Sequence, residues 1–560
     1  MTPEDKARAF CERERAFRLG TLLTETSHPA TRTLSQAAQE DVSAAIRMLQ
    51  TVDRDLPPVL KATLQGGGYT KLVTALRRAL RDGRRVFVTG CGATGRLAIL
   101  LEACWRRAVA ELSAEHPDAA AWSDTVTSVM AGGDFALIKS VEGFEDFPDF
   151  GRRQIAEGEL AQDDVVIAVT EGGETSFVIG TAWEGVDRGA EVFFVYNNPT
   201  DLLREHVQRS REVIEDDRVT KIDLHTGPMA VAGSTRMQAT TIELAVVGAA
   251  MEDALLGAAD RDVPSADERV AAFNALLDVV EAPDAVTVMA DLTRREAELY
   301  ERGGRVLYFA DTLLLDILTD TTERSPTFSL PAFRRRDDHV SARSWSFVKD
   351  PGRDTAAAWE AMLGRPIRGV DWDRDVYAAM GAPGDVVANP PALDAATIEK
   401  FPIGCEPEDQ PSQLVVTLHS ADDPEDFARP DAFCLRIGAS RGTGALGGHI
   451  AVPAAASLAG PMRLGDHLAA KLALNTLSTA TMAVMGRLAG NWMVHVRTSN
   501  KKLIDRGVRL LVDQTGMGYE TACIELFRAM DHAERLPPDA ERPSPVAWVI
   551  QQHGTANAAE

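Results

Sequence analysis

The stretch RVFVTGCGATGRLAIL, residues 85–100, decides the fold of the first half of this chain. It begins with residues 86–89, a short run of apolar and β-branched side chains that is typical of a buried strand. Three glycines interrupt this run: Gly90, Gly92 and Gly95. After them, apolar residues return at helical spacing. A helix that starts directly after a tight turn presents unpaired N–H groups and a positive dipole end, which suit an anion. The stretch is consistent with a phosphate-binding loop, to which the Thr94 hydroxyl could add a donor, and equally with an ordinary tight turn.

The overall composition excludes some classes of partner. The chain has 560 residues, of which 45% are hydrophobic and 25% are charged, and its formal net charge is -24. A chain of this length is expected to form roughly three or four domains. So acidic a protein is a poor partner for nucleic acid or an anionic membrane. It can still bind a phosphorylated sugar, because a small pocket can be locally positive.

The cysteines and the first residues of the chain predict a cytoplasmic protein, and we expect neither a metal nor a cofactor. Six cysteines are scattered with no CxxC pair, which fits neither a disulfide framework nor a zinc site. The first residues are charged and lack the apolar core of a signal peptide. Residues 242–259 come closest to an apolar span of about 18 residues, but acids interrupt them at Glu243, Glu252 and Asp253.

Strands and helices alternate after the glycine-rich loop. Residues 125–130, 164–170 and 191–196 read as further short strands, each followed by a turn and, in most cases, a helical pattern. Such alternation predicts a parallel sheet with helices on both faces, and such sheets bind ligands at the carboxyl ends of their strands. We therefore expect the turns around Gly90, Gly132 and Gly172 to share one edge of the sheet.

The second half of the chain repeats the first in a diverged form. Residues 302–309 match residues 82–89, and a glycine opens a long helix at Gly460 as another does at Gly233. The two landmarks are similarly spaced in both halves, although two common strand–helix units could also match by coincidence. The glycine loop is replaced by ADTLLL at residues 310–315, so we expect one phosphate site per chain.

This pattern predicts four parts of the chain. They are an N-terminal helical segment at 1–65, a first sheet domain at 66–262, a second and diverged one at 263–498, and a C-terminal helical cap at 499–560.

Several motifs, in a shared order, carry a resemblance to a known family. The glycine loop resembles that of the sugar isomerase (SIS) domain of N-acetylmuramic acid 6-phosphate etherases. So do the motifs TET…PAT at 24–31, AGGD at 131–134, VEGFED at 141–146, GSTR at 233–236, LNTLST at 474–479, GNWMV at 490–494 and SNKKL at 499–503. The doubled chain and the Gly-Cys-Gly loop are closer to the glucokinase regulatory protein, a two-domain relative that binds fructose phosphates and has a C-terminal helical cap. The resemblance implies an α/β fold with two SIS-type, doubly wound parallel-sheet domains in tandem.

The same resemblance implies which residues bind the ligand. The phosphate would be held by the glycine loop, a second turn and two cations. The residues implied are Gly92, Thr94, Gly95, Thr170, Thr175, Ser234, Arg236 and Lys502. The second turn departs from the family, because Glu171 and Glu174 replace a segment that is often rich in serine, and acids are unexpected beside a phosphate. Gln238 likewise stands where a lysine is usual.

The etherase resemblance also implies a pair of catalytic acids. The etherase eliminates lactate from an opened sugar, for which one carboxylate removes a proton next to the carbonyl and another protonates the leaving oxygen. The base corresponds to Glu142. The acid expected shortly after the glycine loop is Cys104 here, but the second half retains a match at Glu323. If the halves pack like a homodimer of the single-domain enzyme, the two glutamates would meet over one phosphate site, although either could only bind sugar hydroxyls or cap a helix.

Three functions remain open from the sequence. The first is a lyase that acts on a sugar phosphate such as N-acetylmuramic acid 6-phosphate. The second is a non-catalytic regulator of a sugar kinase that responds to a ligand of the fructose 6-phosphate type. The third is an aldose–ketose isomerase of phosphosugars, which needs only one base. In each case the duplicated chain is plausible as a pseudo-dimeric monomer, because the second half can replace a partner subunit.

Overall fold

The structure is a computed structural model of the whole chain. It describes residues 1–407, 412–420, 423, 432–438, 447–452, 455, 458–496, 498, 500–536 and 544–554, except for the side chain of Glu142. The position of Ser499, the first residue of the SNKKL motif, lies outside these residues.

The first half forms a parallel five-stranded sheet with the order β2-β1-β3-β4-β5. Its strands are β1 (Val86–Gly90), β2 (Val126–Met130), β3 (Val165–Thr170), β4 (Glu191–Tyr196) and β5 (Val219–Asp223). The residues of β1 and β3 are buried throughout, because helices cover both faces of the sheet. The first four strands lie where the sequence predicts them, whereas β5 was not predicted.

The second half forms another parallel five-stranded sheet, with the order β10-β9-β8-β6-β7. Its strands are β6 (Val306–Ala310), β7 (Ser346–Lys349), β8 (Leu414–His419), β9 (Phe433–Gly438) and β10 (Gly447–Ala451). Counted from its own first strand, this sheet has the same order as the first one. The connectivity therefore confirms the predicted α/β fold with two doubly wound sheets in tandem. The sequence predicts strands at residues 413–419 and 434–437, where β8 and β9 lie, whereas β7 and β10 were not predicted.

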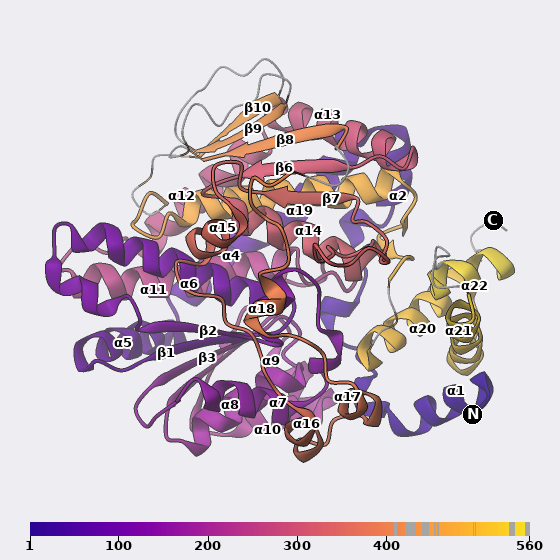
Figure 1. The fold of residues 1–560 in the computed structure, drawn as a ribbon, viewed down its shortest axis with the longest axis horizontal. Coiled ribbons are helices and arrows are strands. Elements are labelled where there is room, and N and C mark those ends of the chain that lie inside the picture. The colour runs from indigo at the N-terminus through magenta and orange to yellow at the C-terminus, as the bar shows by residue number, and fades with distance from the viewer. Residues whose placement is uncertain are drawn as a thin grey trace.

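Helices from both halves pack against one another between the two sheets and join the halves (Figure 1). The first half contributes α6 (Ala93–Ser113) and α11 (Gln238–Ala258), and the second contributes α14 (Leu314–Phe328) and α19 (Leu464–Val484). Every residue of α11 from Gln238 to Leu256 is buried, so this helix has no solvent-facing side. Two of its acids form ion pairs inside the protein with Arg269: Glu252 Oε2 lies 3.1 Å from Arg269 Nη1, and Asp253 pairs with the same guanidinium. The interface between the halves is thus a helical layer within the core.

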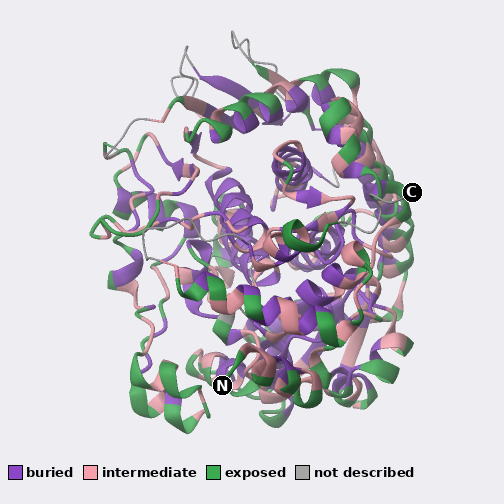
Figure 2. Ribbon diagram, turned by 90° about the vertical axis from the view of Figure 1, so that its right-hand side faces the viewer, coloured by how far each residue is buried: buried purple, intermediate pink, exposed green. Residues whose placement is uncertain are grey.

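The outer helices complete the two halves, and Figure 2 shows that exposed residues gather on their outward faces. The N-terminal helices are α1 (Pro3–Arg13), α2 (Leu34–Glu40), α3 (Val42–Asp53), α4 (Leu56–Leu64) and α5 (Gly67–Asp82). The first half adds α7 (Pro148–Glu157), α8 (Ser176–Asp187), α9 (Thr200–His206) and α10 (Gln208–Glu215). The second adds α12 (Ala266–Val280), α13 (Pro283–Glu301), α15 (Thr355–Leu363), α16 (Arg374–Ala379), α17 (Gly384–Ala388) and α18 (Ala395–Ile398). None of the helices in the described part of the chain is both long enough and apolar enough to cross a bilayer.

The C-terminal helices form a separate layer beside the sheets together with α1 (Figure 1). They are α20 (Lys501–Thr515), α21 (Tyr519–Glu534) and α22 (Pro545–His553). The side chain of Asn500 caps α20, accepting a hydrogen bond from the N–H of Leu503 at 2.8 Å. This cap fixes where α20 begins and so where its first side chains point. We keep the four-part division of the chain as a proposal, supported at residues 262 and 263 by the loop between α11 and α12.

Candidate functional site

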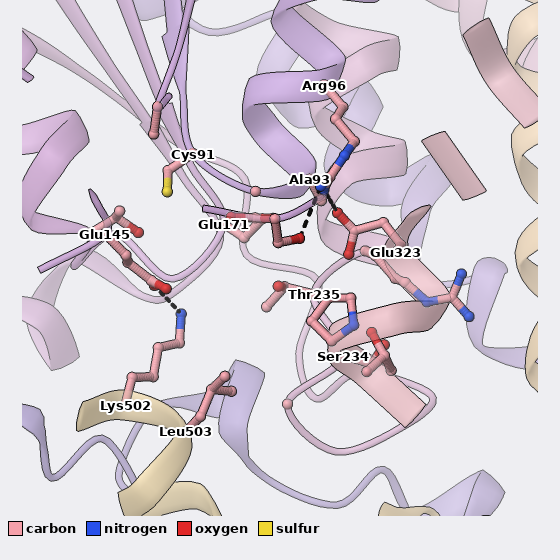
Figure 3. Close-up of a pocket in the computed structure, with 18 of the residues that line it drawn as sticks. Cys91, Ala93, Arg96, Glu145, Glu171, Ser234, Thr235, Glu323, Lys502 and Leu503 are labelled. Atoms are coloured by element: carbon pink, nitrogen blue, oxygen red, sulfur yellow. Dashed lines mark hydrogen bonds and ion pairs between the residues drawn. The ribbon is translucent and has the colours of Figure 1, made fainter. Parts of the chain in front are cut away.

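A pocket of about 120 Å³ lies at the carboxyl edge of the first sheet (Figure 3). Because the strands are parallel, β1, β2 and β3 all end at this edge, and the turn after each strand contributes lining residues. The second half contributes Glu323, Pro326 and Thr327 from α14, and α20 contributes Lys502, Leu503 and Arg506. The pocket is therefore built from the first sheet, the second half and the C-terminal helices together.

The glycine-rich loop carries the chain into α6 at the floor of this pocket. A side chain at Gly90 would place its Cβ 2.4 Å from the carbonyl carbon of Thr94, so the strand end and the helix start touch through backbone alone. Gly92 has φ 59° and precedes a helix start that no side chain caps. The first helical bond is donated by Arg96 N to Gly92 O at 3.1 Å, which leaves the preceding N–H groups without helical partners. Gly92 and Ala93 line the pocket, so its floor has the geometry of an anion site.

Two of the predicted phosphate ligands in this loop do not line the pocket. The Thr94 hydroxyl accepts a hydrogen bond from Cys91 N and donates one to Cys91 O, both at 3.0 Å, so it holds the loop closed. Gly95 faces β2, because a Cβ there would lie 2.7 Å from Met130 Cγ. The expected donor at Thr94 is corrected accordingly: its side chain shapes the loop, and the backbone at Gly92 and Ala93 faces the cavity.

The turn after β3 forms the second wall. Thr175 lines the pocket, whereas Thr170 lies behind it and donates its hydroxyl hydrogen to Thr175 Oγ1 at 3.1 Å. Glu174 does not line the cavity, but its Oε1 pairs at 2.7 Å with Nζ of Lys502, which does. Burial opposes ionisation of Glu174, but Lys502 and Arg209 outweigh it and lower the pKa of this carboxyl. The negative charge of Glu174 is therefore already neutralised by cations of the protein.

Glu171 is a buried carboxyl group in the pocket lining, and its pKa is raised. It is 7% exposed and lines the cavity. Burial raises its pKa to about 7, nearby Glu323 and Glu145 add to the rise, and Lys502 opposes it. A carboxyl group of this kind exchanges a proton near neutral pH, which suits general acid–base chemistry. The sequence marked Glu171 only as an obstacle to phosphate, because its pKa depends on neighbours that come from distant parts of the chain.

Glu323 reaches the pocket from α14 and pairs with the Arg96 guanidinium of α6 (Figure 3). Arg96 is fully buried and also donates to Ala136 O at 2.7 Å and to Ser140 Oγ at 3.0 Å. The geometry thus brings Glu323 of the second half to the glycine loop of the first half. The backbone of Glu142 begins a short turn of helix at Glu142–Phe144, directly after the lining residue Val141.

Arg236 lines the pocket, but its guanidinium is engaged by the second half. It pairs with Asp320 Oδ1 at 3.0 Å and donates to Thr479 Oγ1 at 2.8 Å and to Ser478 Oγ at 3.2 Å. The cation expected beside the ligand therefore joins the halves, whereas its neighbour Ser234 lines the cavity.

Lys502 and Arg506 bring positive charge from α20. Lys502 Nζ lies 3.4 Å from Glu145 Oε1 (Figure 3). As described above, it also pairs with Glu174. Burial opposes the charged form of Lys502, but the two glutamates outweigh this effect and raise the pKa of Lys502 well above its usual value. Arg506 forms two hydrogen bonds with the buried Glu25 carboxylate, at 2.6 and 3.0 Å. These buried ion pairs hold the start of α20 against the pocket.

The corresponding loop of the second half is closed to an external anion. Asp423 Oδ1 accepts a hydrogen bond from Thr312 N at 3.1 Å, so a carboxylate of the protein occupies the start of α14. Cys104 occupies the position at which the family resemblance places an acid in the first half. It is buried and hydrogen-bonded to His467. His467 Nδ1 in turn lies 3.0 Å from both oxygens of Asp316. No group of His, Cys, Asp and Glu side chains in the described residues has the arrangement of a metal site.

Comparison with known proteins agrees with this architecture. Residues 70–183 match the family model of the glucokinase regulatory protein N-terminal SIS domain. The N-acetylmuramic acid 6-phosphate etherase of Clostridium acetobutylicum is 30% identical over 229 residues, which cover 41% of this chain and 67% of the relative. The enzyme of the same name from Trichormus variabilis is 31% identical over 226 residues, covering 40% of this chain and 64% of the relative.

Solved structures are more distant. The C-terminal domain of glucosamine-fructose-6-phosphate aminotransferase from Francisella tularensis aligns with a TM-score of 0.37 and 7% identity, over 77% of this chain and 96% of that one. Glucosamine-6-phosphate deaminase from Thermotoga maritima aligns with a TM-score of 0.31 and 10% identity, over 75% and 95%. These scores support no argument about function, and the assignment depends on the sequence relatives and the tandem sheets. The chain belongs to the family of SIS-domain proteins that includes the N-acetylmuramic acid 6-phosphate etherases and the glucokinase regulatory protein.

Proposed function

We propose that the pocket binds a phosphosugar, with the phosphate at the start of α6. Three features support this proposal: the open N–H groups around Ala93, the hydroxyls of Thr175 and Ser234 in the lining, and the positive end of the α6 dipole. Relatives of the chain are named for N-acetylmuramic acid 6-phosphate, a sugar phosphate whose charge matches such an anion site.

We further propose that the protein is a lyase that cleaves the lactyl ether of N-acetylmuramic acid 6-phosphate. The observation that carries this proposal is the presence of several carboxyl groups in one pocket with the glycine loop, namely those of Glu145, Glu171 and Glu323. Elimination needs one group to remove a proton from the carbon next to the carbonyl and another to protonate the leaving oxygen. Carboxyl groups in different environments are suited to those two roles, and we assign them to Glu171 and to Glu142, whose turn directly follows the lining residue Val141.

The roles follow from the surroundings of each acid. Glu171, with a pKa of about 7, carries a proton in a substantial fraction of molecules at neutral pH and is proposed as the donor to the leaving oxygen. Glu142 keeps the role of base that the family resemblance implies. Glu323, which the resemblance implies as the acid, is held by Arg96 and is proposed to orient the sugar beside Glu171.

A lactate-release assay tests the lyase. The wild-type protein is incubated with N-acetylmuramic acid 6-phosphate, and lactate is measured against a heat-inactivated sample. We expect release by the wild type, a fall of at least a hundredfold for Glu171→Gln or Glu142→Gln, and a smaller fall for Glu323→Gln, in line with the roughly 10²–10⁴-fold that general acid–base groups contribute. Wild-type protein that binds the substrate in calorimetry but releases no lactate would refute the lyase and leave the binding proposal standing.

A regulator of a sugar kinase is the second candidate. The match of residues 70–183 to the glucokinase regulatory protein domain favours it, as do the ion pairs that already neutralise Lys502 and Arg236. In this case the acids would serve only to recognise sugar hydroxyls. Addition of saturating protein and fructose 6-phosphate to a sugar kinase assay would lower kinase activity if the regulator is correct, and unchanged activity would count against it.

A further inference from the structure

Two cysteines from opposite ends of the chain meet in the C-terminal helical layer. Cys11 lies in the last turn of α1 and Cys523 in the second turn of α21, and these two helices pack against each other (Figure 1). Both residues are free thiols in this structure, and the two thiols are hydrogen-bonded to each other. Because hundreds of residues separate them in the sequence, no local spacing such as CxxC reveals the pair.

The packing of α1 on α21 holds the two sulfur atoms together. Cys523 Sγ lies 3.7 Å from Ala7 O, one helical turn before Cys11. Phe10 packs on Phe527 with 5.9 Å between the ring centroids, and these two rings lie beside the cysteines on their respective helices. The thiol pair therefore belongs to a packed interface between two helices and does not depend on the conformation of a loop.

The surroundings give the two thiols different reactivity. Cys11 is partly exposed, whereas Cys523 is fully buried. Burial raises the pKa of Cys523, the neighbouring Cys11 adds to the rise, and Arg18 opposes it. The Arg18 guanidinium also donates to Cys11 O at 2.8 Å, so a positive charge lies close to the pair. A thiol that solvent reaches beside a guanidinium is the one that an oxidant attacks first.

We propose that Cys11 and Cys523 are the site of a reversible disulfide bond, which forms when a hydroperoxide oxidises the protein. This inference does not depend on the proposed lyase. The bond joins α1 covalently to α21, which packs against α20. Because the first turn of α20 contributes Lys502 and Leu503 to the pocket, oxidation fastens the helical layer that lines one side of the pocket.

The oxidation takes place in two balanced steps. The Cys11 thiolate attacks one oxygen of hydrogen peroxide, the O–O bond breaks, and Cys11 becomes a sulfenic acid while the departing oxygen takes up a proton and leaves as water. Cys523 then attacks the sulfur of Cys11, the S–S bond forms, and the S–O bond breaks with loss of a second water. Two electrons pass from the two thiols to the peroxide, and a thiol reductant restores both thiols.

The disulfide is expected to raise the melting temperature. A bond between residues 11 and 523 closes a loop that contains nearly the whole chain, and in the chain-entropy model a cross-link restricts the unfolded chain more as the loop lengthens. With the unfolding entropy typical of 560 residues, the stabilisation expected of such a bond corresponds to a rise of about 2–5 °C.

The test is oxidation of the full-length protein by hydrogen peroxide. Remaining thiols are blocked with iodoacetamide, the protein is digested with trypsin, and the peptides are mapped by mass spectrometry without reductant. Thermal unfolding is measured on the same samples before and after addition of dithiothreitol. Cys11→Ser changes a partly exposed position and is the main variant, Cys523→Ser is the second, and Cys405→Ser is the control because it removes an exposed cysteine outside the pair.

We expect the wild type and Cys405→Ser to yield peptides 9–13 and 510–528 linked to each other, together with a rise in melting temperature that dithiothreitol reverses. Cys11→Ser and Cys523→Ser should each lose both the link and the rise. Peptides that stay separate after peroxide treatment would overturn the inference, as would a link to another cysteine or between two molecules. A rise that persists in Cys11→Ser, or a link that leaves the melting temperature unchanged, would overturn the proposed fastening of the layer.

Discussion

Replacement of Glu171 by Gln is expected to stabilise the protein at alkaline pH. The side chain is buried, and burial is the main reason why its pKa rises from 4.5 to about 7. A group that binds its proton more tightly in the folded state makes folding less favourable once the proton is lost. Wild-type stability should therefore fall as the pH rises from about 4.5 to about 7, and the Gln variant should lack this fall.

The size of the effect follows from the two pKa values. At about 1.4 kcal/mol per pKa unit, the difference between 4.5 and about 7 corresponds to about 3 kcal/mol. Unfolding of 560 residues as one unit carries an entropy of roughly 1.2 kcal/mol/K, so this energy shifts the melting temperature by about 2–3 °C. Unfolding of a smaller unit would give a larger shift.

The assay is thermal unfolding between pH 5 and pH 8.5, with Glu174→Gln as the matched control. Glu174 belongs to the same turn and is buried too, but Lys502 pairs with it at 2.7 Å and contributes to a lowered pKa. A lowered pKa contributes stability above the unfolded value of 4.5, and this stability is lost only as the pH falls. We therefore expect Glu171→Gln to raise, and Glu174→Gln to lower, the melting temperature at pH 8.5.

The result that would refute this reasoning is a pair of parallel curves. If the melting temperatures of wild type and Glu171→Gln keep a constant difference from pH 5 to pH 8.5, Glu171 does not titrate near neutral pH. Shifts of the same sign for both variants would show that the turn simply tolerates or rejects glutamine, and the proposed proton donor would lose its support.

Two further predictions concern backbone contact and buried charge. Gly90→Ala would place a Cβ 2.4 Å from the backbone of the following helix start. We expect it to lower the free energy of unfolding by about 1–3 kcal/mol and to weaken the binding of sugar phosphate at least tenfold in calorimetry. Gly67→Ala, whose Cβ would have no atom within 4 Å, is the control and should change neither quantity. Arg506→Met leaves the buried Glu25 with one guanidinium fewer and should lower the free energy of unfolding by about 3–5 kcal/mol in urea at pH 7. Loss of the exposed Arg528–Glu4 pair in Arg528→Met should have little effect, because solvent screens this pair. A similar loss in both Arg variants would contradict the second prediction.

Local patterns of the sequence were sufficient for much of the fold. The buried strands of the first sheet are continuous apolar runs, as in the VVIAVT segment of β3, because helices cover both of their faces. The strands that were not predicted lack such runs. The edge strand β5 reads VTKID and is only partly buried, and the edge strand β10 contains two glycines, so neither has the apolar signal of a central strand. The repeat was visible because both halves preserve the spacing of their landmarks.

The sequence by itself determined the tandem α/β fold, the glycine loop and the segments that surround the pocket, because strand and helix periods and turn glycines are local properties. Only the tertiary structure decided which partners and charges surround each side chain of the pocket. In the folded protein, the Thr94 hydroxyl bonds to the backbone of its own loop, and Arg236 pairs with Asp320 of the second half. Glu171 is surrounded by charged groups from α14 and α20. Charge pairing and burial depend on groups that are hundreds of residues apart, as Arg96 and Glu323 are, and no local pattern records which of them meet.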